Sequence, residues 1–519
     1  MVSASAGGAP SAARWAGFAL MGVGMFMAIL DVQVVATSLP TIQAALKIAP
    51  DQMSWIQTAY LIAEVIAIPL TGLLTRILSM RWLFVGAVTT FVLASAGCAA
   101  SHGLGELLAW RVLQGFSGGT LIPAVFSAVF LLFPPSAEAL ATTIAGVLAV
   151  LAPTLGPIVG GWITQTYSWR WLFLINLAPG LLSGFGAIFL LPREPVDIGE
   201  GRRLDVAALV LMATALAALE IALKEAPQRG WASPAVLGLL AFTAVSLVIF
   251  VRRTLGVAHP TVMLSKFADR NFAIGCVLSF VLGVGLYGSV YMMPVFLALV
   301  RGHGPLRIGE IMLVTGVAQL VTAPVAVALE RRIDARLLAA AGFLVFGLGV
   351  AMSAMQTEAT DFRAMAIPQI VRGVAIMFCL LPPTRLALGH LAPLEVPDAS
   401  GLFNLMRNLG GAIGLALIDT VIYGRSPAHA RTITAALQNG DVATATAVGI
   451  PIDLFVQHRG PVDAVTQAML EPMVQKLALV RAINDAWLVV AGLTFCALLV
   501  VPFAVRPAMA ATGKAKLPA

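Results

Sequence analysis

Residues 206–223 read VAALVLMATALAALEIAL, from Val206 to Leu223. This stretch is apolar around the whole circumference of a helix, and the stretch from Leu337 to Met355 has the same character. About twenty helical residues rising ~1.5 Å each cross the ~30 Å hydrocarbon core of a bilayer. Neither stretch alternates apolar and polar residues as the strands of a transmembrane β-barrel do. Both are therefore predicted to be membrane-spanning helices.

The composition extends this interpretation to the whole chain. Of 519 residues, 59% are hydrophobic and 11% are charged, against roughly 25% charged in a soluble domain. Mean hydropathy is +0.93. The net charge of +7 is spread over many segments without a run of five or six basic residues, which argues against a nucleic-acid partner. The sequence predicts an all-α polytopic membrane protein.

Windows of about nineteen apolar residues predict fourteen spans, arranged as six, two and six. The first six are predicted near 15–35, 54–74, 82–99, 104–126, 139–163 and 171–191. The inserted pair is predicted near 206–223 and 234–251, between charged segments at 193–205 and 252–270. The last six are predicted near 272–297, 308–329, 337–355, 364–386, 401–422 and 486–505.

The distribution of Lys and Arg predicts the orientation, because cytoplasmic loops carry an excess of both. With the N-terminus in the cytoplasm, sixteen basic residues of the short segments face inward and seven face outward. An even number of spans then places both termini in the cytoplasm. The long connection from Tyr423 to Ile483 is expected on the outer side.

The two groups of six share a sequence echo, which is typical of transporters built from repeats. Five residues recur at a constant displacement of 255: Pro69, Leu74, Arg76, Arg81 and Leu83 reappear as Pro324, Leu329, Arg331, Arg336 and Leu338. Arg111 and Arg372 also each lie several residues inside the fourth span of their half. We expect an N-terminal bundle at 1–192, a linker with the two inserted helices at 193–271, a C-terminal bundle at 272–505 with a long periplasmic loop at 424–482, and a cytoplasmic tail at 506–519.

Two motifs known from soluble enzymes lie inside predicted spans. Gly283-x-Gly285-x-x-Gly288 has no preceding strand, and Gly115-x-Ser117-x-Gly119 has no strand-to-helix turn, so both are interpreted as helix-packing glycines. The chain contains no GxxxxGK[ST] sequence for ATP and no HExxH or clustered Cys and His for a metal. No enzymatic activity, cofactor or metal is predicted.

Charged residues inside the spans are the candidate functional residues, because each costs about 2.5–3.5 kcal/mol at the bilayer centre on insertion scales. Asp31, Glu64 and Arg111 lie at predicted depths of roughly 12, 15 and 10 Å from the outer ends of their spans. We expect the three to meet at one level and to couple proton movement to transport. A static interhelical ion pair is the alternative.

Several segments together resemble the major facilitator superfamily, and within it the fourteen-span drug:proton antiporters of EmrB/QacA type. Leu30-Asp31 to Pro40 resembles the first-helix motif, Arg111-x-x-Gln114-Gly115 matches the fourth-helix motif, and Gly156-Pro157-x-x-Gly160-Gly161 resembles the antiporter motif of the fifth helix. The resemblance implies two six-helix bundles that rock about a central cavity. It also implies export of lipophilic compounds in exchange for protons, with Arg111 in proton coupling and the fifth-helix glycines sealing the cavity.

One motif of this family is altered. The loop after the second span usually carries an acid, but here Thr75 stands in its place within Gly72-Leu73-Leu74-Thr75-Arg76-Ile77-Leu78-Ser79-Met80-Arg81. Gly72, Arg76 and Arg81 keep the pattern. The two arginines are candidates for the cytoplasmic motif or, alternatively, only for topology anchors.

The second half lacks an acid at the place of Asp31, since aligning Pro294 with Pro40 puts Gly285 there. Proton coupling is therefore expected in the first half. The candidate cavity residues, for which core packing is the alternative, are Gln114, Tyr287, Tyr291, Asn404, Arg407 and Asn408.

The expected function is proton-coupled efflux of small lipophilic compounds across the inner membrane. The missing motif acid favours a second possibility, an importer or uncoupled facilitator, and a membrane scaffold or receptor is a third. The resemblance also suggests a periplasmic adaptor and an outer-membrane channel as partners, with the segment from Tyr423 to Ile483 as the docking candidate.

Overall fold

The computed structural model describes residues 11–48, 50–53, 55–195, 205–257, 260, 262–457 and 464–505. Within these ranges every regular element is a helix, which confirms the predicted all-helical class. Helices satisfy all their backbone hydrogen bonds internally, and hydrocarbon offers no water to do so. Apolar runs of this length are therefore helical throughout.

The helices follow one another in three groups. The first group comprises α1 (Ala12–Leu46), α2 (Pro50–Met53), α3 (Trp55–Ala67), η1 (Ile68–Leu70), α4 (Thr71–Ala100), α5 (Leu104–Leu132), α6 (Pro135–Thr166), α7 (Trp171–Leu174) and α8 (Leu177–Leu190). The second comprises α10 (Val206–Arg229), α11 (Pro234–Gly256) and η2 (Leu264–Ala268). The third comprises α12 (Arg270–Leu299), α13 (Pro305–Glu330), α14 (Ala335–Met352), α15 (Phe362–Leu388), α16 (Val396–Gln438), α17 (Val442–Val448), α18 (Ile452–Gln457), α19 (Ala464–Val500) and η3 (Val501–Phe503).

Among the described residues, 13 helical stretches are long and apolar enough to cross a membrane. One of them, Trp55–Ala100, contains 46 residues and is therefore long enough for two crossings. Ser79, at φ 69°, interrupts the helix within this stretch, in the loop predicted between the second and third spans. The total of fourteen spans and the cytoplasmic placement of both termini stay predictions.

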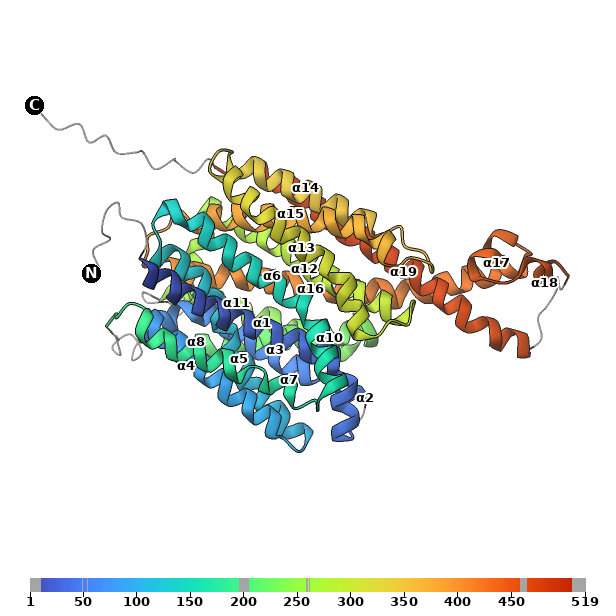
Figure 1. The fold of residues 1–519 in the computed structure, drawn as a ribbon, viewed down its shortest axis with the longest axis horizontal. Coiled ribbons are helices and arrows are strands. Elements are labelled where there is room, and N and C mark those ends of the chain that lie inside the picture. The colour runs from blue at the N-terminus through green and yellow to red at the C-terminus, as the bar shows by residue number, and fades with distance from the viewer. Residues whose placement is uncertain are drawn as a thin grey trace, which may run out of the picture.

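The long helices lie side by side in one elongated body, and α1 begins at the end where α19 finishes (Figure 1). Buried apolar side chains form separate cores in the two large groups, with Phe84 and Phe126 in the first and Phe296 and Phe343 in the third. Helices α10 and α11 contribute to a further cluster with residues of α3, α12 and α16. The inserted pair thus packs against both large groups.

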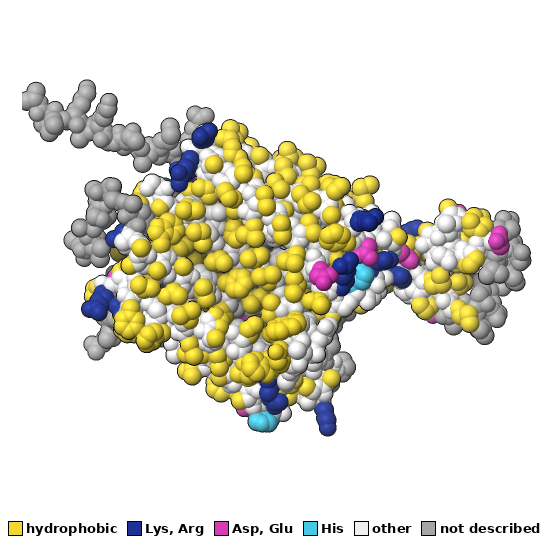
Figure 2. All heavy atoms as spheres, in the orientation of Figure 1, with side chains coloured by type: hydrophobic (Ala, Val, Ile, Leu, Met, Phe, Trp, Pro, Cys, Tyr) yellow, Lys and Arg dark blue, Asp and Glu magenta, His cyan; other side chains and the backbone are white. Residues whose placement is uncertain are grey.

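The outer surface of the body is apolar. Figure 2 shows hydrophobic side chains covering its middle, with charged side chains toward its ends. Phe185, Phe189 and Val321 are 69%, 70% and 71% exposed. Such continuous apolar exposure is unfavourable in water and suits contact with lipid. The chain is a multi-pass membrane protein.

The segment predicted as a long outer loop is helical in its described parts. Helix α16 continues to Gln438, α17 and α18 follow, and α19 begins at Ala464. Together they project from one end of the body (Figure 1). Ile433, Val448 and Ala478 are buried in a small apolar core of their own, which gives this projection a defined structure.

Candidate functional site

A fully buried ion pair lies between α1 and α5. The guanidinium Nη1 of Arg111 donates to Oδ2 of Asp31 over 2.6 Å, and both side chains are 0% exposed. Gln114 Nε2 and Asn176 Nδ2 donate to the other carboxylate oxygen over 3.0 and 2.7 Å. Three donors therefore surround the one carboxylate, which is the condition under which a buried charge is tolerated.

The same pair is tied to two further helices. Arg111 Nε donates to the carbonyl oxygen of Ile56 in α3 over 3.1 Å, and the ring of Tyr60 lies 4.4 Å from its guanidinium carbon. Ser95 of α4 accepts hydrogen bonds from Gln114 and Asn176 over 2.8 and 3.3 Å. A change in the charge of Asp31 would therefore alter hydrogen bonds that connect α1, α3, α4 and α5.

Glycines of α5 allow this arrangement. A Cβ added to Gly115 would lie 2.9 Å from Cα of Tyr60, and one added to Gly119 would lie 2.6 Å from the carbonyl oxygen of Glu64. Only glycine permits α3 and α5 to approach this closely. The packing interpretation of these glycines is confirmed, and the close approach holds Tyr60 over Arg111.

The prediction that Glu64 acts together with Asp31 and Arg111 stays a prediction. Glu64 is 8% exposed and makes no hydrogen bond or ion pair to any residue that the structure describes. Tyr60, one turn earlier on α3, occupies the face of Arg111 instead. The structure joins Asp31 and Arg111 directly, and Glu64 lies within electrostatic range of Arg111 without bonding to it.

The antiporter segment of α6 contacts both halves of the protein. Its predicted residues are Gly156, Pro157, Gly160 and Gly161. A Cβ on Gly156 would lie 3.3 Å from the backbone carbon of Gln33 in α1, and one on Gly161 would lie 2.9 Å from Cβ of Pro305 in α13. Pro157 lies inside the helix, and the carbonyl oxygen of Gly160 accepts a hydrogen bond from the Thr164 hydroxyl over 2.8 Å. The segment packs α6 against α1 and α13 together.

The altered loop motif makes a contact between the two large groups of helices. Arg76 of α4 forms an ion pair with Asp398 at the start of α16. Gly72, one turn earlier, leaves the space that Asp398 occupies. Thr75, at the position of the usual motif acid, donates its hydroxyl to the carbonyl oxygen of Thr71 over 2.7 Å. The acid of this contact is thus supplied by α16.

Arg81 stays within the first group of helices. Its guanidinium donates to the carbonyl oxygen of Ile188 in α8 and lies 5.5 Å from the ring centroid of Trp82. These contacts tie α4 to α8, so Arg81 does not take part in the contact that Arg76 makes.

Two candidate cavity residues bond to each other. The hydroxyl of Tyr287 in α12 donates to Oδ1 of Asn408 in α16 over 2.7 Å. Tyr291, one turn later, donates over 2.7 Å to Asp419. Both bonds link α12 with α16. Such links between helices agree with core packing, the alternative to a cavity role for these residues.

Arg407 and Asn404 lie on α16 near the first group of helices. The guanidinium carbon of Arg407 lies 5.4 Å from the ring centroids of Phe126 and Phe403. Asn404 donates to the carbonyl oxygen of Ser400 over 2.9 Å. Arg407 is 7% exposed, and its Nε and Nη2 have no hydrogen-bond partner in the described part of the chain.

Two further acids that are not among the candidates predicted from the sequence lie inside helices. Asp419 accepts the Tyr291 hydroxyl, and Glu220 of α10 is 8% exposed and within electrostatic range of Glu64. Both carry the signal that singled out Asp31, a carboxylate inside an apolar run. Applying that criterion to every span would have found them.

Comparison with known proteins gives consistent results. Residues 21–415 match the family described as Major Facilitator Superfamily. The chain is 38% identical to the "Colistin resistance protein EmrB" of Acinetobacter baumannii over 426 residues, 82% of this chain and 83% of that protein. It is 30% identical to the "Multidrug export protein EmrB" of Escherichia coli K12, over 79% of this chain and 80% of that protein. The solved structure of the human organic anion transporter MFSD10 shares the fold, with a TM-score of 0.59, 13% identity and coverage of 94% and 99% of the two chains.

Proposed function

Because this chain belongs to the major facilitator superfamily, we propose that it exports small lipophilic, drug-like compounds across the inner membrane in exchange for protons. The names of the relatives support the direction and the substrate class, since one is a multidrug export protein and another a colistin resistance protein. The free energy released by proton entry is large enough to drive export against a concentration gradient. One proton entering down ~100 mV releases about 2.3 kcal/mol, and each pH unit adds about 1.4 kcal/mol.

The observation that carries the proton step is the buried pair of Asp31 and Arg111. Protonation of Asp31 replaces the ion pair with a neutral acid, and Arg111 keeps its contacts with Gln114, Ile56 and the rings of Tyr60 and Phe173. The link between α1 and α5 weakens, while the link between α5 and α3 remains. In our proposal this change alters the packing of the first bundle, and substrate and proton compete for the resulting arrangement.

Alternating access then requires the two large groups of helices to rock against each other. We propose the bundles at 1–192 and 272–505, with the inserted pair at 193–271 between them and a tail at 506–519. Contacts between them exist near both ends, at Arg76 with Asp398 and at Gly161 with Pro305. Opening one end while keeping the other closed would expose a central cavity to one side at a time.

Transport by purified protein in vesicles tests the proposal. Under an imposed pH gradient, the wild-type protein should move a lipophilic dye uphill, and Asp31→Asn should abolish uphill movement. Glu106→Gln serves as the matched control, because Glu106 lies on α5 five residues before Arg111 with its side chain 48% exposed. Uphill dye movement by Asp31→Asn at the native rate would contradict the proposed coupling.

We further propose that the helical projection binds a periplasmic adaptor, through which an outer-membrane channel is reached. Support comes from its own apolar core and from its position beyond one end of the body (Figure 1). Removing residues 439–463 should abolish cross-linking to the adaptor and leave dye transport in vesicles intact. Unchanged cross-linking would exclude this segment as the docking site.

A further inference from the structure

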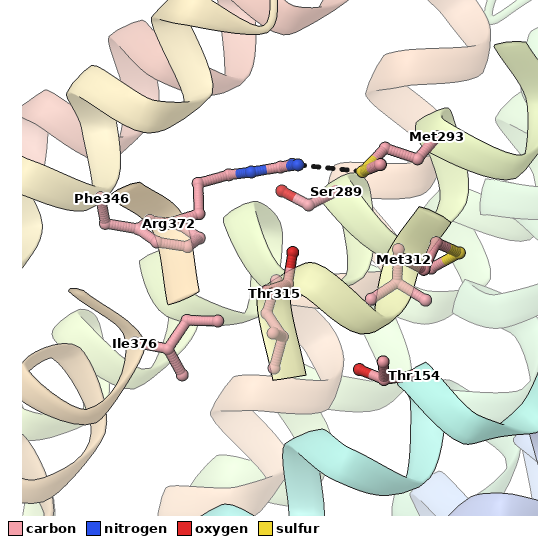
Figure 3. Close-up of a pocket in the computed structure, with 10 residues that line it drawn as sticks. Thr154, Ser289, Met293, Met312, Thr315, Phe346, Arg372 and Ile376 are labelled. Atoms are coloured by element: carbon pink, nitrogen blue, oxygen red, sulfur yellow. Dashed lines mark hydrogen bonds between the residues drawn. The ribbon is translucent and has the colours of Figure 1, made fainter. Parts of the chain in front are cut away.

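A small pocket lies beside the buried guanidinium of Arg372. Its lining includes Arg372 of α15, Ser289 and Met293 of α12, and Thr315 of α13. The cavity measures about 30 Å³, room for one or two groups the size of a water molecule. Figure 3 shows the guanidinium extending toward Met293, with the hydroxyls of Ser289 and Thr315 nearby.

Arg372 carries a charge that no acid in the described chain neutralises. It is 2% exposed. Nη2 contacts the sulfur of Met293 at 2.9 Å, and the ring of Trp487 lies 4.9 Å from the guanidinium carbon. Nε and Nη1 have no hydrogen-bond partner among the described residues. A thioether and an aromatic face compensate a buried cation only in part, so the site is chemically incomplete.

Comparison of the two halves shows that Arg372 lacks, among the described residues, the counter-charge that Arg111 has. Arg111 and Arg372 occupy equivalent places in the two halves, and Arg111 is paired with Asp31. At the place equivalent to Asp31 the second half has Gly285, and a Cβ there would meet the ring of Phe346. The second half therefore has the arginine, but a glycine and an aromatic ring stand where the first half has the acid.

We propose that this pocket binds the carboxylate of an amphiphilic anion, whose apolar tail lies along the neighbouring apolar side chains. This inference rests on the proposed export function and specifies one substrate class for it. The carboxylate supplies the counter-charge that Asp31 supplies in the first half, accepting hydrogen bonds from Nε and Nη1 of Arg372. The hydroxyls of Ser289 and Thr315 donate to the carbonyl oxygen of Gly285 over 2.6 Å and to Oε1 of Gln369 over 3.1 Å, and each becomes a further donor to the carboxylate on rotating toward it.

The composition of the lining favours an amphiphile over a small inorganic ion. Met293, Met312 and Phe346 form flexible apolar walls around the one charged group, and methionine adapts to varied apolar shapes. The 30 Å³ cavity fits the headgroup, and the tail requires the space that opens between the helices during the cycle. Thr154 of α6 completes the lining, so a bound headgroup touches both bundles.

Equilibrium dialysis of radiolabelled octanoate against the purified full-length protein in lipid nanodiscs tests the proposal. Octanoate should bind saturably, and unlabelled octanoate should compete more strongly than octanol or octyltrimethylammonium, which have the same tail. Arg372→Gln should weaken octanoate binding by about tenfold or more, the loss expected for a charge-assisted bond. Arg372→Lys should retain part of the affinity. Arg363→Gln is the control, because Arg363 is an exposed residue of the same helix and should bind as the wild type does.

Equal octanoate binding by wild type and Arg372→Gln would overturn the proposal, as would equal competition by octanol. Competition by chloride or acetate as strong as that by octanoate would also overturn it, since the pocket would then hold small anions only. Should Arg372→Gln fail to fold, the double variant Ser289→Ala, Thr315→Val replaces it and should also weaken binding. Dye export without octanoate binding would refute this inference alone, whereas absence of proton-driven dye export by the wild type would refute the proposed function.

Discussion

Replacing Asp398 with Asn should shift the protein toward conformations in which the ends of α4 and α16 are apart. Asp398 of the third helical group forms an ion pair with Arg76 of the first. The Asp398 side chain is 1% exposed and that of Arg76 is 20% exposed, so solvent screens the pair only partly. A hydrogen bond to a charged group contributes about 1.5–3 kcal/mol. At about 2 kcal/mol, its loss changes the ratio of separated to joined states by about thirtyfold.

The expected population change is large enough to measure. If the separated state amounts to about 1% in the wild type, a thirtyfold shift raises it to about 23%. Spin labels can be attached to cysteines introduced at Leu78 and Leu394, which are 37% and 86% exposed. Double electron–electron resonance then measures the distance between the two labels. Among the described cysteines Cys496 alone is exposed, and replacing it with Ser limits labelling to the introduced sites.

Two comparisons make the result specific to this contact. Arg76→Gln should produce a shift in the same direction as Asp398→Asn, and the double variant should shift the distances by less than the sum of the two, because each single variant already breaks the shared ion pair. Glu395→Gln is the control, since Glu395 lies at the same end of α16 but pairs with Lys266 of η2. Unchanged distances in Asp398→Asn, or additive effects of the two single variants, would refute the proposed contact between the bundles.

Two further substitutions probe other contacts. Gly156→Val places a side chain against Gln33 of α1, so overpacking should cost about 1–3 kcal/mol and lower both the thermal unfolding temperature and the dye transport rate; a native transport rate would exclude a tight α1–α6 contact. The backbone N–H of Phe362 lowers the pKa of Asp361 to about 2, below its unfolded value of about 3.9. Its ionisation therefore stabilises the fold above about pH 4, and this contribution is lost as the pH falls toward about 2. The unfolding temperature of Asp361→Asn should lie below that of the wild type at neutral pH, and the gap should narrow in acid; a gap independent of pH would contradict this.

The sequence predicted the helices and one ion pair because both depend on local or strongly constrained features. Apolar length alone defines a span. Asp31 and Arg111 were recognisable because charges inside spans require partners, and the structure joins them. The sequence does not predict which residue of α3 contacts Arg111. Tyr60 and Glu64 are four residues apart, on one face of α3 but about 6 Å apart along its axis, and depth counted from an approximate span end does not resolve that distance.

Contacts between the two bundles could not be predicted from the sequence. Arg76 and Asp398 are separated by 322 positions, and no pattern in either segment indicates that they meet. Thr75 signalled that the usual motif acid was missing, but its replacement by an acid of α16 depends on how α4 and α16 pack. The helical character of the projection was also unexpected, because its polar residues resemble those of a loop and its apolar residues form a core only after folding.

The two halves share an arginine and differ in its counter-charge, and we propose that this difference gives them different tasks. Arg111 is neutralised by Asp31, so its environment changes when a proton arrives and alters the packing of its own bundle. Arg372 has no such acid among the described residues, so its environment changes only when an anion arrives from outside the chain. Helix α6 connects the two sites, because Gly156 packs on α1 next to the first and Thr154 borders the second. A movement of α1 relative to α6 therefore changes the pocket around Arg372, and a headgroup held there resists that movement, which is the reciprocity that exchange of proton for cargo requires.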